Sequence, residues 1–489
     1  MSVAEIDGRI DGRARFARVP MWVWLGAGVY LLLLVRGNDL LNDPDTLWQI
    51  KVGQGILDTL TLPHVDTYSF TRAGAPWIST SWLAQVVLAK AYALGSWSGV
   101  VVLSAAAVAA AFALFVHLSG RRWPAPHCAF AALIALALSA QHFLARPHVL
   151  AMPVMVAWIG GLIAASDRRV PPSFWLLPLM VLWVNLHGSF IFGLALVAPI
   201  MLDAVWNADA AQRRMLALRW IAFGVCAVAA ACVTPYGWRS LAAAKAILSL
   251  GAMLPLIAEW APPNFARFGL LEGTILLLIG AALWRGVRLS PPRILLALGL
   301  LHMGLSHTRN IEIFALLMPL VLAAPLAQQV GWMGDVARGM RPAPILAAIA
   351  VAAVLTFGIA RAMSFHPREA ALPSAALAAL KARGASRVLN DYPFGGAMIW
   401  EGMPTFIDGR TELYGERFGL DALDAVTLRR PDLLFSILNT YRIDATLLTP
   451  ETPAARLMDH LDGWTKVFDD GVAVVHVRTG PAGNSPRIR

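Results

Sequence analysis

Two carboxylates follow directly after the first long apolar stretch of the sequence. Residues 42–48 read NDPDTLW, so Asp43 and Asp45 flank a single proline. Near a membrane surface a low dielectric raises the pKa of a carboxylate, which suits it to act as a general base toward a hydroxyl. The alternative for Asp45 is a helix N-cap, because Asp is favoured there and interacts well with the helix dipole. One carboxylate can serve in both roles.

The Asp-Pro-Asp segment also resembles a DxD metal site, with Asp43 and Asp45 as ligands of Mg²⁺ or Mn²⁺. No further ligands accompany them, and the sequence has no His-rich motif. The cysteines, Cys128, Cys226 and Cys232, fall in apolar runs without metal-ligand spacing. We therefore assign no cofactor, and a divalent metal at the two aspartates stays an open alternative.

The composition is that of a membrane protein. Of the 489 residues 58% are hydrophobic and only 14% are charged, which lies far outside the usage of soluble proteins. Runs such as 98–119 and 343–363 are long enough to cross a hydrocarbon core, which needs roughly 20 apolar residues per helix. The net charge of +10 belongs to loops that the positive-inside rule places in the cytoplasm, so it does not indicate a nucleic-acid partner.

We predict an all-α polytopic membrane protein of about eleven transmembrane helices with a small C-terminal α/β soluble domain. Residues 1–18 would form a cytoplasmic arm, 19–364 the transmembrane domain, 365–480 the extracytoplasmic domain and 481–489 a disordered tail. The N-terminus would be cytoplasmic and the C-terminal domain periplasmic, in the inner (cytoplasmic) membrane of a bacterium. The predicted spans are 19–35, 98–119, 127–144, 148–165, 173–187, 190–206, 219–235, 269–285, 294–306, 311–327 and 343–363.

This topology places every unusual polar cluster on the outer face of the membrane. The first outer loop, 36–97, contains two predicted interfacial helices, 45–58 and 80–95, joined by a turn-rich connector, 62–77. Polar groups at membrane depth are expensive and tend to mark function, so their convergence predicts a single outward-facing site. The clusters are NDPDTLW, LPHVDTYSF, ARPH (145–148), NLHGS (185–189), TPYGWR (234–239), EWAPPN (259–264) and SHTRN (306–310).

An apolar first span followed at once by an acidic motif and an aromatic-containing helix resembles the GT-C superfamily of membrane glycosyltransferases. That superfamily includes the catalytic subunit of oligosaccharyltransferase, the protein O-mannosyltransferases and bacterial glycan-modifying transferases. The D-P-x-x-x-W spacing from Asp43 to Trp48 and the polar clusters carry the resemblance, over roughly residues 19–365. It implies a polyprenyl-phosphate-linked sugar donor, an active site under the first outer loop and an acidic base in that loop.

By that resemblance Asp45 is the first choice for the catalytic base and Asp43 the second. The Asp-Pro-Asp arrangement departs from the more usual acidic pairs of the superfamily, so the choice between the two stays open. Asp66 in HVDTYSF is a third candidate, and its alternative role is an Asx-type turn with Thr67 or Ser69.

A donor phosphate brought under a lid loses water and needs cationic partners. Arg309 and Arg146 meet that demand, and Arg239 is a weaker third; the alternative for each is snorkelling to lipid headgroups. Histidines at predicted helix ends either orient hydroxyls of the sugar or acceptor, or are ordinary hydrogen-bonding residues. The other candidate substrate-binding residues are His148, His187, His307, Asn185, Glu259, Trp48 and His64.

In the C-terminal domain, SRVLNDY, PTFIDGR and ATLLT read as strands, 420–442 as a helix, and the last segment as a hairpin turning at Asp470-Gly471. FIDGRTELYG brings Asp408, Arg410 and Tyr414 together. This motif either binds an acceptor, closes over the first outer loop, or is a strand-end turn with an internal salt bridge.

The predicted function is an inverting glycosyltransferase that moves a sugar from a polyprenyl-phosphate donor to a glycan, lipid or protein acceptor on the outer membrane face. One alternative is a glycan ligase or polymerase with a diphosphate-linked donor. The other is a non-catalytic membrane assembly protein or a transporter, although transporters usually carry internal repeats and mid-span charges that are not evident in this sequence.

The topology predicts that residues 170 and 400 lie on opposite sides of the membrane. Fusions of a compartment-sensitive reporter at these two positions should report the cytoplasm for residue 170 and the outer side for residue 400. Both reporters on one side would contradict the topology.

Overall fold

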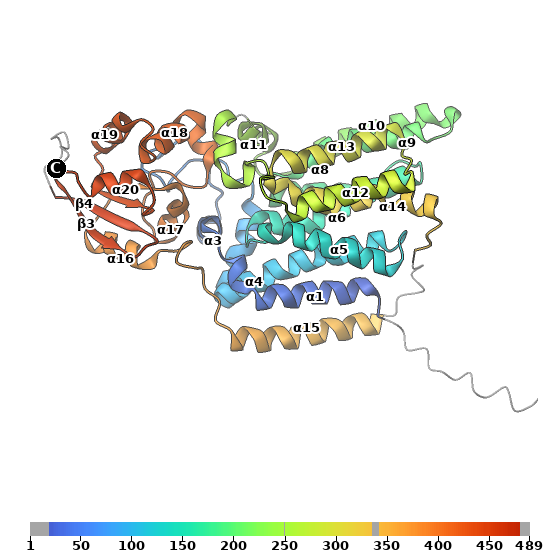
Figure 1. Ribbon diagram of the computed structural model, residues 1–489, viewed down its shortest axis with the longest axis horizontal. Coiled ribbons are helices and arrows are strands. Elements are labelled where there is room, and N and C mark those ends of the chain that lie inside the picture. Colours follow the sequence, from blue (N-terminus) through green and yellow to red (C-terminus); the bar gives the residue numbers. More distant parts are fainter. Residues whose placement is uncertain (1–18, 249, 335–341, 480–489) are drawn as a thin grey trace, which may run out of the picture.

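The computed structural model describes residues 19–248, 250–334 and 342–479. The predicted arm, 1–18, and the predicted tail, 481–489, lie outside the described residues. A bundle of helices with roughly parallel axes occupies one end of the molecule, and a small α/β unit occupies the other (Figure 1). The bundle helices are α1 Met21–Val35, α4 Trp82–Ser119, α5 Ala125–Ser139, α6 Pro147–Asp167, α7 Leu177–Leu186, α8 Phe190–Ala195, α9 Val197–Trp206, α10 Ala210–Ala231, α12 Leu270–Arg285, α13 Pro291–Ser306, α14 Ile311–Val330 and α15 Pro342–Ala362.

Each segment predicted as a span is largely helical in the structure. Among the described residues, five helices are both long and apolar enough to cross a membrane: Trp82–Ser119, Pro147–Asp167, Ala210–Ala231, Thr308–Val330 and Ile345–Ala362. The other predicted spans correspond to shorter helices or pairs of helices, so the figure of about eleven crossings stays a prediction.

The two predicted interfacial helices are present. The first is α3 (Pro44–Thr59), and the second is the start of α4, which leaves helical geometry at Gly95 and Ser96 before the apolar stretch begins. The two helices pack closely, because a Cβ on Gly53 would lie 2.0 Å from the backbone oxygen of Gln85. Only a glycine permits this approach, which brings α3 down onto the bundle.

The α/β unit is built on a four-stranded sheet in the order β1-β2-β4-β3. β1 and β2 are parallel, and β4 is antiparallel to both β2 and β3. The hairpin predicted at Asp470-Gly471 joins β3 to β4. The elements are α16 Ser374–Ala382, β1 Val388–Asn390, α17 Gly395–Trp400, α18 Thr411–Val426, α19 Pro431–Thr440, β2 Ala445–Leu448, α20 Pro453–Met458, β3 Trp464–Asp469 and β4 Val474–Arg478.

Two local predictions in this unit are wrong. The helix predicted at 420–442 is two helices, α18 and α19, because Pro431 begins a new helix and the residue before a proline is disfavoured in helical geometry. The segment PTFIDGR is not a strand of the sheet. Its Thr405 pairs instead with the outer loop, donating its backbone N–H to Tyr68 and accepting from the backbone N–H of Phe70.

A fully buried arginine fastens the α/β unit to the outer loop. Arg410 donates two hydrogen bonds to Asp408, at 2.8 and 2.7 Å, and a third to Asp66 of the loop at 2.6 Å. The Tyr414 hydroxyl completes the cluster by donating to Asp408 at 2.7 Å. Of the alternatives for FIDGRTELYG, the structure therefore combines an internal salt bridge with closure over the first loop.

A second buried arginine ties helices together at the opposite end of the bundle. Arg293, in the first turn of α13, pairs with Asp203 of α9 and, at 2.8 Å, with Asp167 at the end of α6. The other ends of α6, α13 and α14 carry Arg146, His307 and Arg309. The ends of these helices far from the α/β unit are therefore fixed by ion pairs, while their other ends meet the α/β unit.

Replacing Arg410 by Gln should loosen the α/β unit from the outer loop. Breaking a buried ion pair costs roughly 3–5 kcal/mol, because Asp66 and Asp408 are left as uncompensated charges. Hydrogen–deuterium exchange of the purified protein should then speed up over residues 64–77. The matched control is Arg417→Gln in the same helix, since the Arg417 side chain is 97% exposed. Equal exchange in both variants would contradict this role of Arg410.

Candidate active site

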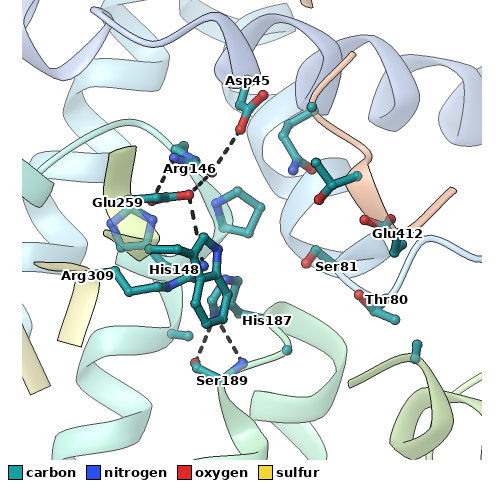
Figure 2. A pocket seen from close by; sticks show the side chains of 18 of the residues that line it. Asp45, Thr80, Ser81, Arg146, His148, His187, Ser189, Glu259, Arg309 and Glu412 are labelled. Carbon is teal, nitrogen blue, oxygen red and sulfur yellow. Dashed lines mark hydrogen bonds and ion pairs between the residues drawn. The ribbon is translucent and has the colours of Figure 1, made fainter. Parts of the chain in front are cut away.

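A cavity of about 360 Å³ lies where the outer ends of the bundle helices meet the α/β unit. Its walls come from α3, residues 76–81 before α4, α6 and the segment that precedes it, residues 187–192 and 257–260, the start of α14 and the two residues before it, and residues 409–413 of the α/β unit. Figure 2 shows charged groups from several of these segments directed toward one another. Of the residues proposed from the sequence, the cavity is lined by Asp45, Trp48, Arg146, His148, His187, Glu259 and Arg309.

The two aspartates of NDPDTLW have different structural roles. Asp43 is the N-cap of α3, and its Oδ1 accepts a hydrogen bond from the Asp45 backbone N–H at 2.7 Å. Pro44 occupies the first helical position, where its missing N–H costs nothing. Asp45 is therefore not the capping residue, and its side chain faces the cavity. Asp43 therefore caps the helix, and Asp45 lines the cavity.

Asp45 is held by two donors. Its Oδ1 accepts from Trp48 Nε1 at 2.9 Å, one turn further along α3. Its Oδ2 accepts from Arg146 Nη2 at 2.8 Å. Of the two acids before Trp48, the indole contacts Asp45 rather than Asp43, since residues three apart on a helix lie on the same face. The indole fixes the carboxylate in one orientation.

Arg146 is the hub of the site. Besides Asp45, it contacts Asp43 Oδ2 at 3.2 Å and both carboxylate oxygens of Glu259 at 3.3 Å. The ARPH, NDPD and EWAPPN clusters, far apart in the sequence, thereby meet at one guanidinium, as Figure 2 shows for Asp45 and Glu259. The sequence-based prediction that these clusters converge is consistent with this geometry.

Arg309 is paired less tightly. Its nearest carboxylate oxygen is that of Glu259, at 3.9 Å, and its guanidinium lies over the Trp260 ring, 4.3 Å from the centroid. An arginine stacked on an aromatic face keeps its N–H edges available for another partner. Of the two cavity arginines, Arg309 therefore has the fewer and longer carboxylate contacts.

Burial and charge separate the carboxylates by their pKa values. Burial raises the pKa of Asp45 to about 6, with Arg146 opposing the shift and Asp43 adding to it. Burial also acts to raise the pKa of Glu259, but the charges of Arg146 and Arg309 outweigh it and the pKa falls to about 2. The same cavity thus makes Asp45 a weaker acid than usual and Glu259 a stronger one.

Two cavity histidines have hydrogen-bond partners within the protein. His148 contacts the backbone oxygen of His142 through Nε2 at 2.7 Å, and His187 contacts the Ser189 hydroxyl through Nδ1 at 2.8 Å. Their rings lie 6.2 Å apart. Each contact occupies one ring nitrogen, so the other nitrogen of each ring remains for a ligand.

The α/β unit supplies the roof of the cavity. A Cβ on Gly409 would lie 2.1 Å from Asp45 Oδ1, so the loop between Asp408 and Arg410 passes directly over the carboxylate. Glu412 follows and accepts from Trp77 Nε1 at 3.1 Å, and burial raises its pKa. Figure 2 shows Glu412 near Ser81 and Thr80, across from Arg146 and Arg309.

Several cavity residues were not proposed from the sequence, among them Tyr392, Glu412, Glu312 and Gln49. Glu412 lies within the FIDGRTELYG motif, and Glu312 follows SHTRN by two positions. Both are therefore next to motifs that the sequence analysis had singled out. Tyr392 carried none, because its contact with the site depends on how the α/β unit docks.

Other proposed residues lie outside the cavity lining. Asp66 is buried, accepts from the Ser69 backbone N–H and hydroxyl, and pairs with Arg410, so its contacts are those of a turn and docking residue. Asn185 accepts from Trp82 Nε1 and donates to two backbone carbonyls. His307 contacts the backbone oxygen of Trp260. Arg239 and His64 are exposed, the latter beside Tyr236.

The aspartates do not fit a divalent cation in this arrangement. Among the described residues, no three His, Cys, Asp or Glu side chains are grouped to hold a metal ion. Asp43 and Asp45 instead direct one oxygen each to Arg146, and their remaining oxygens serve the helix cap and Trp48. The position between them is filled by a guanidinium.

Comparisons with known proteins concern the fold. No protein-family model matches the chain, and no curated protein matches it. The oligosaccharyltransferase of Archaeoglobus fulgidus in its apo form superposes with a TM-score of 0.54 at 12% identity, covering 87% of this chain and 69% of that one. The archaeal enzyme AglB in complex with an inhibitory peptide and a dolichol-phosphate gives 0.55 at 13%, covering 88% and 69%. ArnT from Cupriavidus metallidurans gives 0.47 at 14%, covering 93% and 97%.

The chain therefore has the GT-C fold of membrane glycosyltransferases, carried by the two oligosaccharyltransferase structures. Its apolar helices make it a membrane protein of that fold. At this level of identity the likeness does not extend to substrates, which must be argued from the cavity itself.

Proposed function

We propose that the protein is an inverting glycosyltransferase that moves one sugar from a polyprenyl-phosphate donor to a hydroxyl of a glycan, lipid or protein acceptor. The reaction would take place on the outer face of the bacterial cytoplasmic membrane. The observation that carries the proposal is the placement of Asp45. Asp45 lines the cavity, and because Asp43 caps the helix the Asp45 carboxylate is not used as a cap. Hydrogen bonds from Trp48 and Arg146 fix its orientation.

In this mechanism Asp45 takes the proton of the acceptor hydroxyl as its oxygen attacks the anomeric carbon. The bond from that carbon to the phosphate oxygen breaks, and the polyprenyl phosphate leaves with the electron pair. The negative charge that develops on the leaving phosphate requires a fixed cation. Arg309 is suited to this role because its only carboxylate contact among the described residues is the 3.9 Å approach of Glu259.

The two walls of the cavity favour a division between donor and acceptor. Arg309, His148 and His187 line the wall that faces the outer ends of the bundle helices, where a lipid phosphate would arrive from the membrane. Glu412 and Ser81 line the opposite wall beneath the α/β unit. A hydroxyl-bearing acceptor would enter between this wall and Asp45. The dolichol-phosphate bound to archaeal AglB, which shares the fold, agrees with a lipid-phosphate donor.

Charge balance favours a monophosphate donor over a diphosphate. Arg146 and Arg309 already face the carboxylates of Asp43, Asp45 and Glu259. A diphosphate would bring more negative charge than a monophosphate into a site where two arginines already face three carboxylates, and uncompensated buried charge is costly. The ligase or polymerase alternative, which depends on arginines, is therefore second. A transporter or a non-catalytic assembly protein has no evident use for a carboxylate tuned by burial and oriented by an indole.

Replacing Asp45 by Asn should abolish transfer while leaving the fold intact, since the amide keeps the size of the carboxylate. General-base catalysis typically contributes about 10²–10⁴-fold, so we expect a loss of roughly that size. The assay gives purified protein radiolabelled polyprenyl-phosphate hexoses, one at a time, with a membrane extract as acceptor, and measures label in the product. Asp58→Asn, at the exposed end of the same helix, is the matched control. Undiminished transfer by Asp45→Asn would remove the general-base proposal.

Transfer should depend on pH through Asp45. A base acts only when ionised, and burial raises the pKa of Asp45 to about 6. The rate should therefore fall about tenfold per pH unit below about pH 6 and level off above it. The measurement is the pH–rate profile at saturating donor, with thermal unfolding at each pH to establish that the protein stays folded. A flat profile between pH 5 and 7 would contradict the assignment.

A further inference from the structure

One guanidinium occupies the place between three carboxylates that come from two separate segments. Arg146 lies 2.8 Å from Asp45, 3.2 Å from Asp43 and 3.3 Å from Glu259. The two aspartates belong to the start of α3, and Glu259 to a short 3₁₀ helix, Ala258–Trp260. Carboxylates are the ligands that a hard divalent cation prefers, but with Arg146 between them these three are not grouped to hold one.

We propose that Arg146 takes the place of a divalent cation in this site, holding Asp43, Asp45 and Glu259 together so that the protein needs no metal there. Arg146 is on this view a positioning residue, which acts through the carboxylates. The proposed effect of Arg146 on metal binding depends only on the geometry of the site. Its proposed effect on sugar transfer also rests on the proposed function.

The chemistry of the guanidinium fits the task. It is planar, always charged and carries five N–H donors, so one group can serve several carboxylates at once. Nη1 contacts Asp43 and Glu259, while Nη2 contacts Asp45 and Glu259. A single positive charge also lowers the proton affinity of the Asp45 carboxylate less than a divalent ion would. The carboxylate is thus oriented without losing the basicity that proton transfer requires.

The backbone holds the guanidinium in position. Arg146 is the N-cap of α6, and Pro147 restricts the geometry on its far side. The preceding residue, Ala145, donates its backbone N–H to the backbone oxygen of Leu40 at 2.7 Å. Leu40 lies three residues before Asp43, so one backbone hydrogen bond ties the segment that carries the cation to the segment that carries two of its anions.

Among the described residues, the only other arginine or lysine within 4 Å of these carboxylates is Arg309, which approaches Glu259 alone. Asp43 Oδ1 is used by the helix cap and Asp45 Oδ1 by Trp48, and Arg309 is 3.9 Å from Glu259. Removing the Arg146 charge therefore leaves three carboxylates facing one another, which repel unless a cation or protons enter.

The test is Mn²⁺ binding, followed by electron paramagnetic resonance, to the full chain in lipid nanodiscs. Arg146→Met, which keeps much of the side-chain volume, should bind Mn²⁺ at least about a hundredfold more tightly than the wild type, because a contact charge has been removed. At Mn²⁺ concentrations that saturate this variant the wild-type site should stay empty. The double variant Arg146→Met/Asp45→Asn should lose this binding. Arg239→Met, at an exposed arginine outside the cavity, should behave as wild type.

Two results would overturn the proposal. One is tight Mn²⁺ binding by the wild type that Asp45→Asn abolishes, since the metal would then share the site with Arg146. The other is a folded Arg146→Met protein that binds no Mn²⁺; Arg146→Gln serves as the second variant if Arg146→Met does not fold. Neither readout uses a sugar donor, so both are independent of the proposed transfer reaction.

The rate of sugar transfer tests the proposed role of Arg146 together with the proposed function. Transfer by the wild type should be unchanged by a metal chelator. In Arg146→Met the low-pH limb of the rate profile should move to higher pH, because the charge that opposes the raised pKa of Asp45 is gone. Added Mn²⁺ should move the limb back. A purely structural arginine would change neither the limb nor its response to Mn²⁺.

Discussion

The site depends on the buried contact of Arg410 with Asp66 and Asp408, which closes the α/β unit over the first outer loop. Together with the backbone hydrogen bonds of Thr405, this contact holds the unit where the loop between Asp408 and Arg410 passes over Asp45 and Gly409 lies against its carboxylate. Closure removes water from the carboxylate, and the loss of water is what raises its pKa. A docking interaction outside the cavity thus sets the proton affinity of the group within it.

Three arginines divide the work of holding this molecule together. Arg293 pairs with acidic residues at the ends of the bundle helices far from the α/β unit. Arg410 joins the α/β unit to the first outer loop through Asp66. Arg146 contacts the acidic groups at the cavity. Each is surrounded by carboxylates, because a buried guanidinium is tolerated only when its charge and its N–H groups are matched. Arg309 has the weakest pairing of the cavity arginines, and that difference is why it is assigned to the ligand.

The class of fold followed from patterns that are local in the sequence. Apolar runs, basic loops and the polar clusters at helix ends located the helices of the bundle, and the NDPDTLW motif located the start of a helix that carries both an acid and an indole. The errors were also local. PTFIDGR has the composition of a strand but pairs with the outer loop, and the segment 420–442 is interrupted by Pro431. Strand-like composition does not specify the partner of a strand.

By itself the sequence determined that the chain is a helical membrane protein with acidic, basic and histidine residues at one end of the bundle, because hydrophobic periodicity and charge act over a few residues. Only the tertiary structure decided that Asp43 caps the helix while Asp45 faces the cavity, that Asp66 is a docking residue, and that Tyr392 and Glu412 complete the walls. Those assignments require contacts between segments hundreds of residues apart, and the geometry of such contacts depends on how whole helices and the α/β unit pack.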